Sequence, residues 1–258
     1  MSLQTIDKSL LTKLLSQNFG EEIFQHWEKT EHLSVKGAVG SAVSILAAEA
    51  FLSQQKTILL ITDDKEDSHY TTTEMEELVG KENVLHLPNS YTEPYQEERT
   101  KNANLVLRTE VINQLNLNNK QKIIVAHISA LNEKVLKKED FKMISHRIKT
   151  GEKLDFDFTE ELLNQFHFNL TDFVSEPGEF AVRGGIVDVF SYSNEKPFRI
   201  TFFGNEIESI KTFDIETQLS VEKVDEFQLV SNINLSTQGE KVPFFDLLPS
   251  DSLIMIKN

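Results

Sequence analysis

The chain has 258 residues, with 41 Asp and Glu against 26 Lys and Arg, a formal net charge of -15 and a sequence pI near 4.9. So acidic a surface repels a phosphate backbone, which disfavours direct DNA binding by this chain. The absence of cysteine excludes disulfides, thiolate metal sites and cysteine nucleophiles, and it fits a reducing cytoplasm. No run of about eighteen apolar residues occurs, so no membrane span is expected.

The first half of the chain alternates between helical and strand patterns. Apolar spacing predicts an amphipathic helix at residues 10–19 and a strand at 32–36. The same reasoning predicts helices at 41–54, 66–79 and 97–115, and short apolar strands at 57–62, 84–87 and 122–126. Such alternation predicts a doubly wound α/β domain over residues 1–147.

A loop in this half has the position of a nucleotide site but not its chemistry. The segment VKGAVGSAVS lies between a strand and a helix, where a P-loop of the form GxxxxGK[ST] would lie. Aligned on Gly37, with Gly40 inside the loop, the second glycine becomes Ala42, the lysine becomes Val43 and the hydroxyl residue is Ser44. Because valine cannot supply the charge that the lysine places on the β- and γ-phosphates, ATP hydrolysis is not expected here. A weak phosphate contact through the helix N-terminus stays an alternative.

The pattern changes after about residue 145. The dense basic cluster at 134–147 is interpreted as a solvated linker helix. A short strand and a helix follow, and then strands succeed one another through tight turns, with the Gly204-Asn205 pair predicting a hairpin. We therefore expect a second, α+β domain with an antiparallel sheet at 148–232. The tail at 233–258 begins as a polar linker and regains strand character at 252–256.

One arginine in the second half has an unusual place. In GEFAVRGGIVDVF, read as one alternating strand, Phe180 and Val182 face a core while Arg183 faces away from it. On this interpretation Ala181 and Val187 flank the cation on the outward face. A mixed cationic and apolar surface of that kind is typical of a docking site for a protein partner.

The same residues carry a family resemblance. The runs GEFAVRGGIVDVF, FRITFFGNEIESI and TFDIETQLS resemble domain 2 of the bacterial transcription-repair coupling factors (Mfd), with a weaker likeness to the excinuclease component UvrB. The Val43 substitution favours the Mfd branch, and residues 88–96 are too few for the hairpin with which UvrB clamps DNA. The resemblance implies a degenerate RecA-like P-loop domain 1a at 1–147, interrupted by domain 2 at 148–232, with 233–258 returning toward domain 1.

The resemblance also implies a function, which is to bind the excinuclease component UvrA. The residues expected at that surface are Arg183, Val187, Ala181, Phe180, Glu179 and Asn169. The expected role is a non-catalytic adaptor for nucleotide excision repair at stalled RNA polymerase, with contacts to polymerase and DNA made by other parts of a longer, ATP-driven translocase. No cofactor is expected, and the seven scattered histidines lack the paired spacing of metal ligands. The alternatives are an intramolecular regulatory domain and a UvrB-type ATPase.

Overall fold

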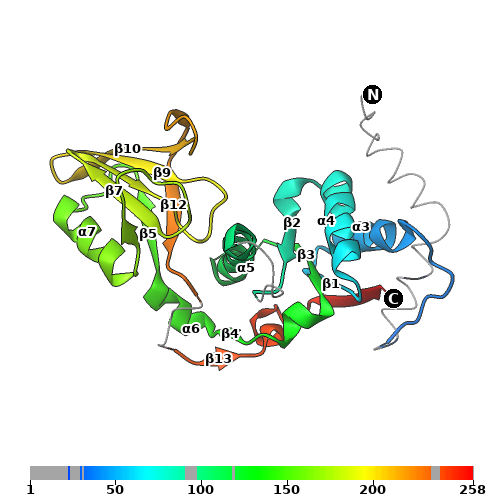
Figure 1. Cartoon of the computed structure of the whole chain (residues 1–258). Helices are drawn as coiled ribbons and strands as arrows, with labels where there is room; N and C mark the ends of the chain where they lie inside the picture. The colour runs from blue at the N-terminus through cyan, green and yellow to red at the C-terminus, as the bar shows by residue number, and fades with distance from the viewer. Residues whose placement is uncertain are drawn as a thin grey trace, which may run out of the picture. The chain divides into compact units, whose positions relative to one another are not determined.

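The computed structural model describes residues 32–90, 98–117, 120–233 and 239–257, together with Ile23 and Thr30. The helix predicted at 10–19 lies outside this range. The described residues form two compact units (Figure 1). The first unit comprises residues up to 87, 119–131 and 248 onward, and the second comprises 88–118 and 132–247.

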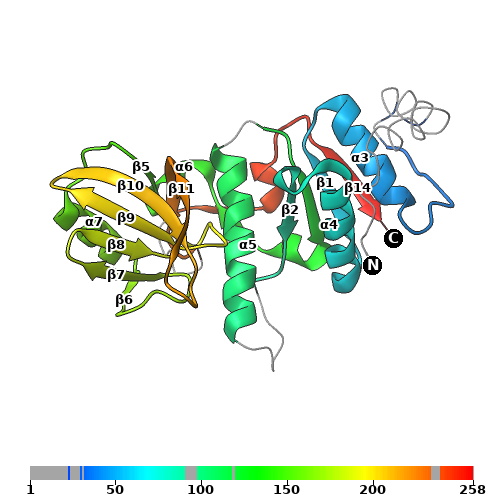
Figure 2. The same cartoon turned by 90° about the horizontal axis from the view of Figure 1, so that it is seen from above.

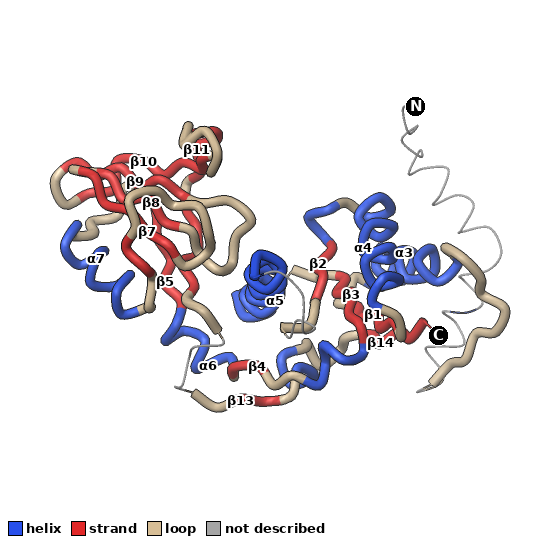
Figure 3. Tube along the Cα trace, in the orientation of Figure 1, coloured by secondary structure: helices blue, strands red, loops and turns tan. Residues whose placement is uncertain are grey.

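The first unit is built on a parallel four-stranded sheet in the order β14-β1-β3-β2. Figure 3 draws its strands in red and its helices in blue. The helices and strands predicted for this unit from residue 41 onward are confirmed to within two residues. The elements are α3 (Ala42–Gln54), β1 (Ile58–Thr62), α4 (Lys65–Val79), the 3₁₀ turn η1 (Lys81–Asn83), β2 (Val84–Leu87), β3 (Ile123–His127), η2 (Ile128–Asn132), which ends in the second unit, and β14 (Leu253–Lys257).

Helices α3 and α4 cover the same face of this sheet, beside each other in Figure 2. Small side chains on α3, including Ala47 and Ala50, let the helix backbone approach the strands closely. Met75 of α4 packs into the same cluster, against alternate residues of β1 and β3. The β1 strand is buried along its whole length, as its uninterrupted apolar sequence predicts.

The strand predicted at 32–36 is not formed, and this prediction is wrong. These residues have no regular secondary structure and all of them are exposed. Leu33 and Val35 alternate as a strand would, but both side chains remain in solvent. Alternation over so few residues stabilises a strand only when a partner strand buries one face.

Two histidines contact each other between α4 and β2. The rings of His69 and His86 lie 4.5 Å apart, and His86 Nδ1 is 3.0 Å from the Thr72 hydroxyl. Burial, with a smaller contribution from the charge on His69, lowers the pKa of His86 to about 4. His86 is therefore neutral in the folded chain at pH 7, and protonating it opposes folding.

The second unit contains a six-stranded sheet in the order β11-β10-β9-β8-β7-β6, antiparallel except for the β6–β7 pair. The hairpin predicted at Gly204-Asn205 is confirmed between β9 and β10. The elements of the second unit are α5 (Glu98–Leu117), β4 (Val135–Leu136), α6 (Lys138–Phe141), η3 (Lys142–Ile144), β5 (Ser145–Lys149), α7 (Phe156–Gln165), β6 (Asn169–Leu170), β7 (Glu179–Arg183), β8 (Ile186–Val189), β9 (Phe198–Phe203), β10 (Glu206–Phe213), β11 (Ser220–Val224), β12 (Glu226–Val230), β13 (Lys241–Val242) and η4 (Phe244–Leu247).

One face of the six-stranded sheet forms the main core of this unit. The ring of Phe156, at the start of α7, meets the ring of Phe202 edge to face at 5.5 Å. Phe227 of β12 stacks on Phe198 of β9 with centroids 4.1 Å apart. Helix α7 begins where Asp155 accepts a hydrogen bond from the Asp157 amide, as an N-cap residue does. This core fixes one face of the sheet and leaves the other for the site described below.

The linker helix predicted at 134–147 is also wrong. The segment contains β4, only four residues of helix in α6, and the start of β5. Val135 and Leu136 are buried and pair with β13, while β5 pairs antiparallel with β12. The partner strands lie about eighty to one hundred residues further along the chain, so no local charge pattern could reveal the pairing. In the described ranges, no helix is both long and apolar enough to cross a membrane.

Candidate functional site

Arg183 lies at the end of β7, in a tight hairpin with β8. Its Cα pairs with that of Ile186, so Gly184 and Gly185 form a two-residue turn. Gly184 has a φ of +59°, a conformation that favours glycine. A Cβ on Gly185 would lie 3.3 Å from the Phe202 carbonyl oxygen of β9, which is a close approach. Both glycines therefore serve the turn that places Arg183 at the sheet edge.

This hairpin corrects the predicted surround of Arg183. Because the turn has two residues, the alternation reverses across it, and Val187 lies on the opposite face of the sheet, fully buried. Phe180 is buried on that core face, as its position in the alternation predicts. Ala181 shares the face of Arg183 but is also buried. An exposed apolar surround made by Ala181 and Val187 is thus wrong. Ala181 belongs instead to a small buried cluster with Val174, Phe190 and Phe213.

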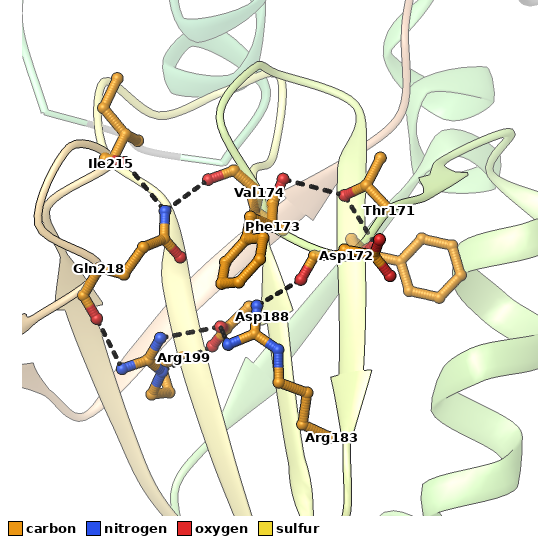
Figure 4. Close-up of polar contacts among 10 residues, drawn as sticks. Thr171, Asp172, Phe173, Val174, Arg183, Asp188, Arg199, Ile215 and Gln218 are labelled. Carbon is orange, nitrogen blue, oxygen red and sulfur yellow. Dashed lines mark hydrogen bonds and ion pairs between the residues drawn. The ribbon is translucent and has the colours of Figure 1, made fainter.

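The residues that contact Arg183 lie in the segment before β7. One terminal NH2 group of the guanidinium donates to the Asp172 carbonyl oxygen at 2.5 Å, and the guanidinium carbon lies 4.6 Å from the centre of the Phe173 ring (Figure 4). The Phe173 side chain is 63% exposed and that of Arg183 is 42% exposed. The cation is therefore held in place by two contacts while keeping part of its charge and its donors in solvent.

A buried carboxylate lies beneath this arrangement. Asp188, 2% exposed, accepts two hydrogen bonds from Arg199, at 2.7 Å from Nε and 2.8 Å from a terminal nitrogen. The same carboxylate lies 3.9 Å from a terminal nitrogen of Arg183. Its hydrogen bond to Arg199 raises the pKa of that guanidinium. Asp188 is thus committed mainly to Arg199, which leaves Arg183 only loosely paired.

Gln218 joins this pair to the segment that carries Phe173. Its side-chain amide donates to the carbonyl oxygens of Val174 and Ile215, at 3.1 and 2.9 Å. Its own backbone carbonyl oxygen accepts from Arg199 at 3.1 Å. These contacts form a continuous network across the face, drawn as dashed lines in Figure 4. We refer to Asp172, Phe173, Arg183, Asp188, Arg199 and Gln218 as the Arg183 network.

The two remaining predicted surface residues differ in their freedom to bind. Asn169 is exposed on β6. Glu179 is half-buried, and its carboxylate accepts hydrogen bonds from the amides of Ser175 and Glu176 at 2.8 and 2.9 Å. Glu179 therefore fixes the turn that precedes β7. Its side chain has a structural task in the chain before any partner is present.

Sequence reasoning missed the residues that hold Arg183. Asp188 and Arg199 are on different strands, and only their register makes them neighbours. Phe173 lies in an irregular segment whose position on the sheet depends on tertiary contacts. A usable signal for Asp188 was present, because a charged residue inside the apolar run IVDVF needs a buried partner.

The loop at residues 37–44 in the first unit holds its polar groups differently. Gly37 and Gly40 have φ values of +84° and +58°, and α3 begins at Ala42. Val43 packs against the core cluster of the first unit. The hydroxyls of Ser41 and Ser44 each donate to the Glu74 carboxylate of α4 at 2.6 Å. A carboxylate thus lies at the helix end where a phosphate would bind in a P-loop.

The hydrogen bonds from the two serines favour the ionised form of Glu74. Burial alone would raise the pKa of Glu74, but the hydrogen bonds from Ser41 and Ser44 and the charge of Lys257 lower it. At pH 7 the carboxylate is ionised and would repel an incoming phosphate. Within the described ranges, no group of three or more histidines and carboxylates is placed to hold a metal ion.

Residues 147–234 match the family described as the UvrB interaction domain, and the whole Arg183 network lies within them. Over these residues the chain is therefore similar to the UvrB interaction domain family. Over most of its length it is also related to transcription-repair-coupling factors. It is 30% identical to the one of Bacillus subtilis (strain 168) over 186 residues, which are 72% of this chain and 16% of that protein.

Two further relatives agree. The transcription-repair-coupling factor of Staphylococcus haemolyticus is 27% identical over 214 residues, covering 82% of this chain and 18% of that protein. That of Haemophilus influenzae is 25% identical over 218 residues, covering 84% and 19%. The chain thus spans less than a fifth of the length of these relatives.

Proposed function

We propose that this chain is the non-catalytic, N-terminal UvrB-like module of a transcription-repair coupling factor and that it binds UvrA. In this role it recruits nucleotide excision repair to stalled RNA polymerase. Polymerase and DNA are contacted by other parts of a longer protein that carries an ATP-driven translocase. The support comes from the UvrB interaction domain at 147–234 and from the relatives that match most of the chain.

The observation that carries the proposal is the state of Arg183. Its guanidinium is positioned by the Asp172 carbonyl and the Phe173 ring, yet it remains 42% exposed. A cation whose geometry is fixed before binding loses little conformational freedom when it meets a partner. Arg183 is proposed to donate charge-assisted hydrogen bonds to UvrA, with Phe173 beside it as an apolar contact. Asn169 and Glu179 lie at the rim of this surface.

The proposed organisation is an interrupted domain. Residues 1–147 form a degenerate RecA-like domain 1a, residues 148–232 form domain 2, and residues 233–258 return to the first domain. The parallel pairing of β14 with β1 supports this arrangement, because residues near 255 complete a sheet begun near residue 58. The degenerate loop at residues 37–44 is proposed not to bind nucleotide, since Val43 faces the core and Glu74 holds both serine hydroxyls.

The test is a calorimetric titration of this chain with purified UvrA. We expect saturable binding by the parent and a loss of about 1 to 3 kcal/mol of binding free energy in Arg183→Ala, the range for a hydrogen bond to a charged group. Arg147→Ala is the matched control, because Arg147 is also exposed and ion-paired, to Glu226 of the neighbouring strand. Unchanged binding by Arg183→Ala would refute the assignment, whereas no binding by a folded parent would favour an intramolecular regulatory role.

A further inference from the structure

A row of side chains crosses five strands of the six-stranded sheet on the face of Arg183. The paired residues, from β7 to β11, are Ala181, Asp188, Arg199, Lys211 and Lys223. Residues directly opposite one another in a ladder point to the same face of a sheet. Arg183 follows Ala181 by two residues and shares that face. We call Arg183, Arg199, Lys211 and Lys223 the cationic row.

The charge of this row contrasts with its surroundings. Across residues 147–234, acidic side chains outnumber basic ones roughly two to one. Half of the basic side chains of that segment nevertheless lie in the cationic row. The carboxylate within the row, Asp188, is buried and bonded to Arg199, so it does not balance the far end. The exposed charges of the row itself are therefore positive, on a segment that is negative as a whole.

The two lysines at the far end of the row lie in an arrangement that does not stabilise the sheet. Lys211 and Lys223 are exposed and directly opposite each other, an arrangement in which like charges destabilise a sheet. Among the described residues, neither ammonium group has an ion-pair partner. Two residues after Thr201 on β9, Phe203 faces the same side and is 79% exposed, and its paired residue on β10 is Glu206. At the other end of the row, the exposed Phe173 ring lies against Arg183, and aromatic residues and arginine are both enriched at protein interfaces.

Resting on the proposed function, we infer that the docking surface extends from Arg183 along the cationic row to Lys211 and Lys223, and that it meets a carboxylate-rich protein surface on UvrA. A nucleic acid fits less well, because the net charge of -15 repels a polyanion at long range. A short row of four cations does not overcome that repulsion. Exposed lysines far from the anchoring arginine act mainly on the encounter rate.

The experiment measures UvrA association and dissociation rates at about 50 and about 300 mM salt, where screening differs strongly. The variant Lys211→Glu with Lys223→Glu is compared with the control Lys149→Glu with Lys153→Glu, which reverses two exposed lysines outside the row. We expect the association rate at low salt to fall about tenfold in the row variant, with a weaker salt dependence and little change in dissociation. The control should match the parent.

Three outcomes would overturn the inference or its basis, and they are distinguishable. Equal association rates in the row variant and the control would overturn the inference, but they would not affect the proposed role of Arg183 in binding. Salt-dependent binding of a labelled DNA duplex that only the row variant loses, with UvrA rates unchanged, would assign the row to nucleic acid. No UvrA binding by the parent would instead refute the proposed function. Lys211→Ala with Lys223→Ala repeats the comparison if charge reversal lowers the melting temperature.

Discussion

The Arg183 network and the α3 N-terminus are both polar sites, but they differ in what remains free. At the start of α3, the hydroxyls of Ser41 and Ser44 are taken up by Glu74, and Val43 is turned into the core. On the sheet, Asp188 satisfies Arg199 and leaves Arg183 half-exposed with donors to spare. The first site is closed by groups of the same chain. In the second, Arg183 is held by contacts within the chain while part of its guanidinium stays exposed to solvent.

The largest expected effect comes from removing the buried carboxylate. Asp188→Ala leaves the Arg199 guanidinium without its bidentate partner, and breaking such a pair costs about 3 kcal/mol of the free energy of unfolding. Urea denaturation measures it, with Glu216→Ala as a control because Glu216 is exposed. A loss below about 1 kcal/mol would show that Asp188 is not the support of this network.

The next effect is a pH dependence in the first unit. The pKa of His86 is about 4 in the folded chain against an ordinary value of 6.5, so the unfolded chain binds a proton more readily. The stability that neutral His86 contributes is complete above pH 6.5 and is lost as the pH falls toward 4. The loss amounts to at most about 3 kcal/mol.

Urea unfolding at pH 7, 5.5 and 4.5 checks this, with His86→Gln as the comparison. We expect the free energy of unfolding of the parent to fall more steeply with acid than that of His86→Gln, which lacks the titrating ring. Parallel curves for the two proteins would contradict the assignment of this acid sensitivity to His86.

A smaller effect is expected where Glu74 closes the α3 N-terminus. Glu74→Ala removes the acceptor for two hydroxyls, one of them on the buried Ser44, and should lower the free energy of unfolding by about 1 to 2 kcal/mol. The variant should still bind no ATP in a calorimetric titration, because the lysine of a working P-loop is missing. ATP binding by Glu74→Ala, but not by the parent, would show that the carboxylate alone keeps nucleotide out.

The smallest effect on stability is expected at Arg183. Its contacts are partly exposed, so Arg183→Ala should change the free energy of unfolding by less than about 1 kcal/mol. A thermal melt of the variant beside Arg147→Ala provides the comparison. A loss of several kcal/mol would make Arg183 a structural residue and would remove the contrast with Asp188.

Local patterns predicted most elements, because apolar runs such as residues 57–62 are buried whatever the topology. They failed where pairing is distant: residues 135–136 form a strand because β13 returns to pair with them. The same limit applies to the site. The outward direction of Arg183 was predictable from strand alternation, but a two-residue turn reversed the faces and moved Val187 into the core. Asp188 and Arg199 depend on register, which no local pattern specifies.

The Glu74 contact shows the same limit in the first unit. The missing lysine of the loop is visible as Val43 in the sequence. The carboxylate that takes up the loop hydroxyls comes from α4, thirty residues from Ser44. The sequence therefore predicts the missing lysine, while the structure identifies the Glu74 carboxylate as the group that the loop hydroxyls contact.

The most direct test of the Arg183 surface is the dissociation constant for UvrA, measured by calorimetry for the parent, Arg183→Ala and Arg147→Ala, each with its melting temperature. Binding by the parent and by Arg147→Ala, weakened about tenfold or more in a normally folded Arg183→Ala, is the predicted result. Equal dissociation constants for all three proteins would contradict a docking role for Arg183.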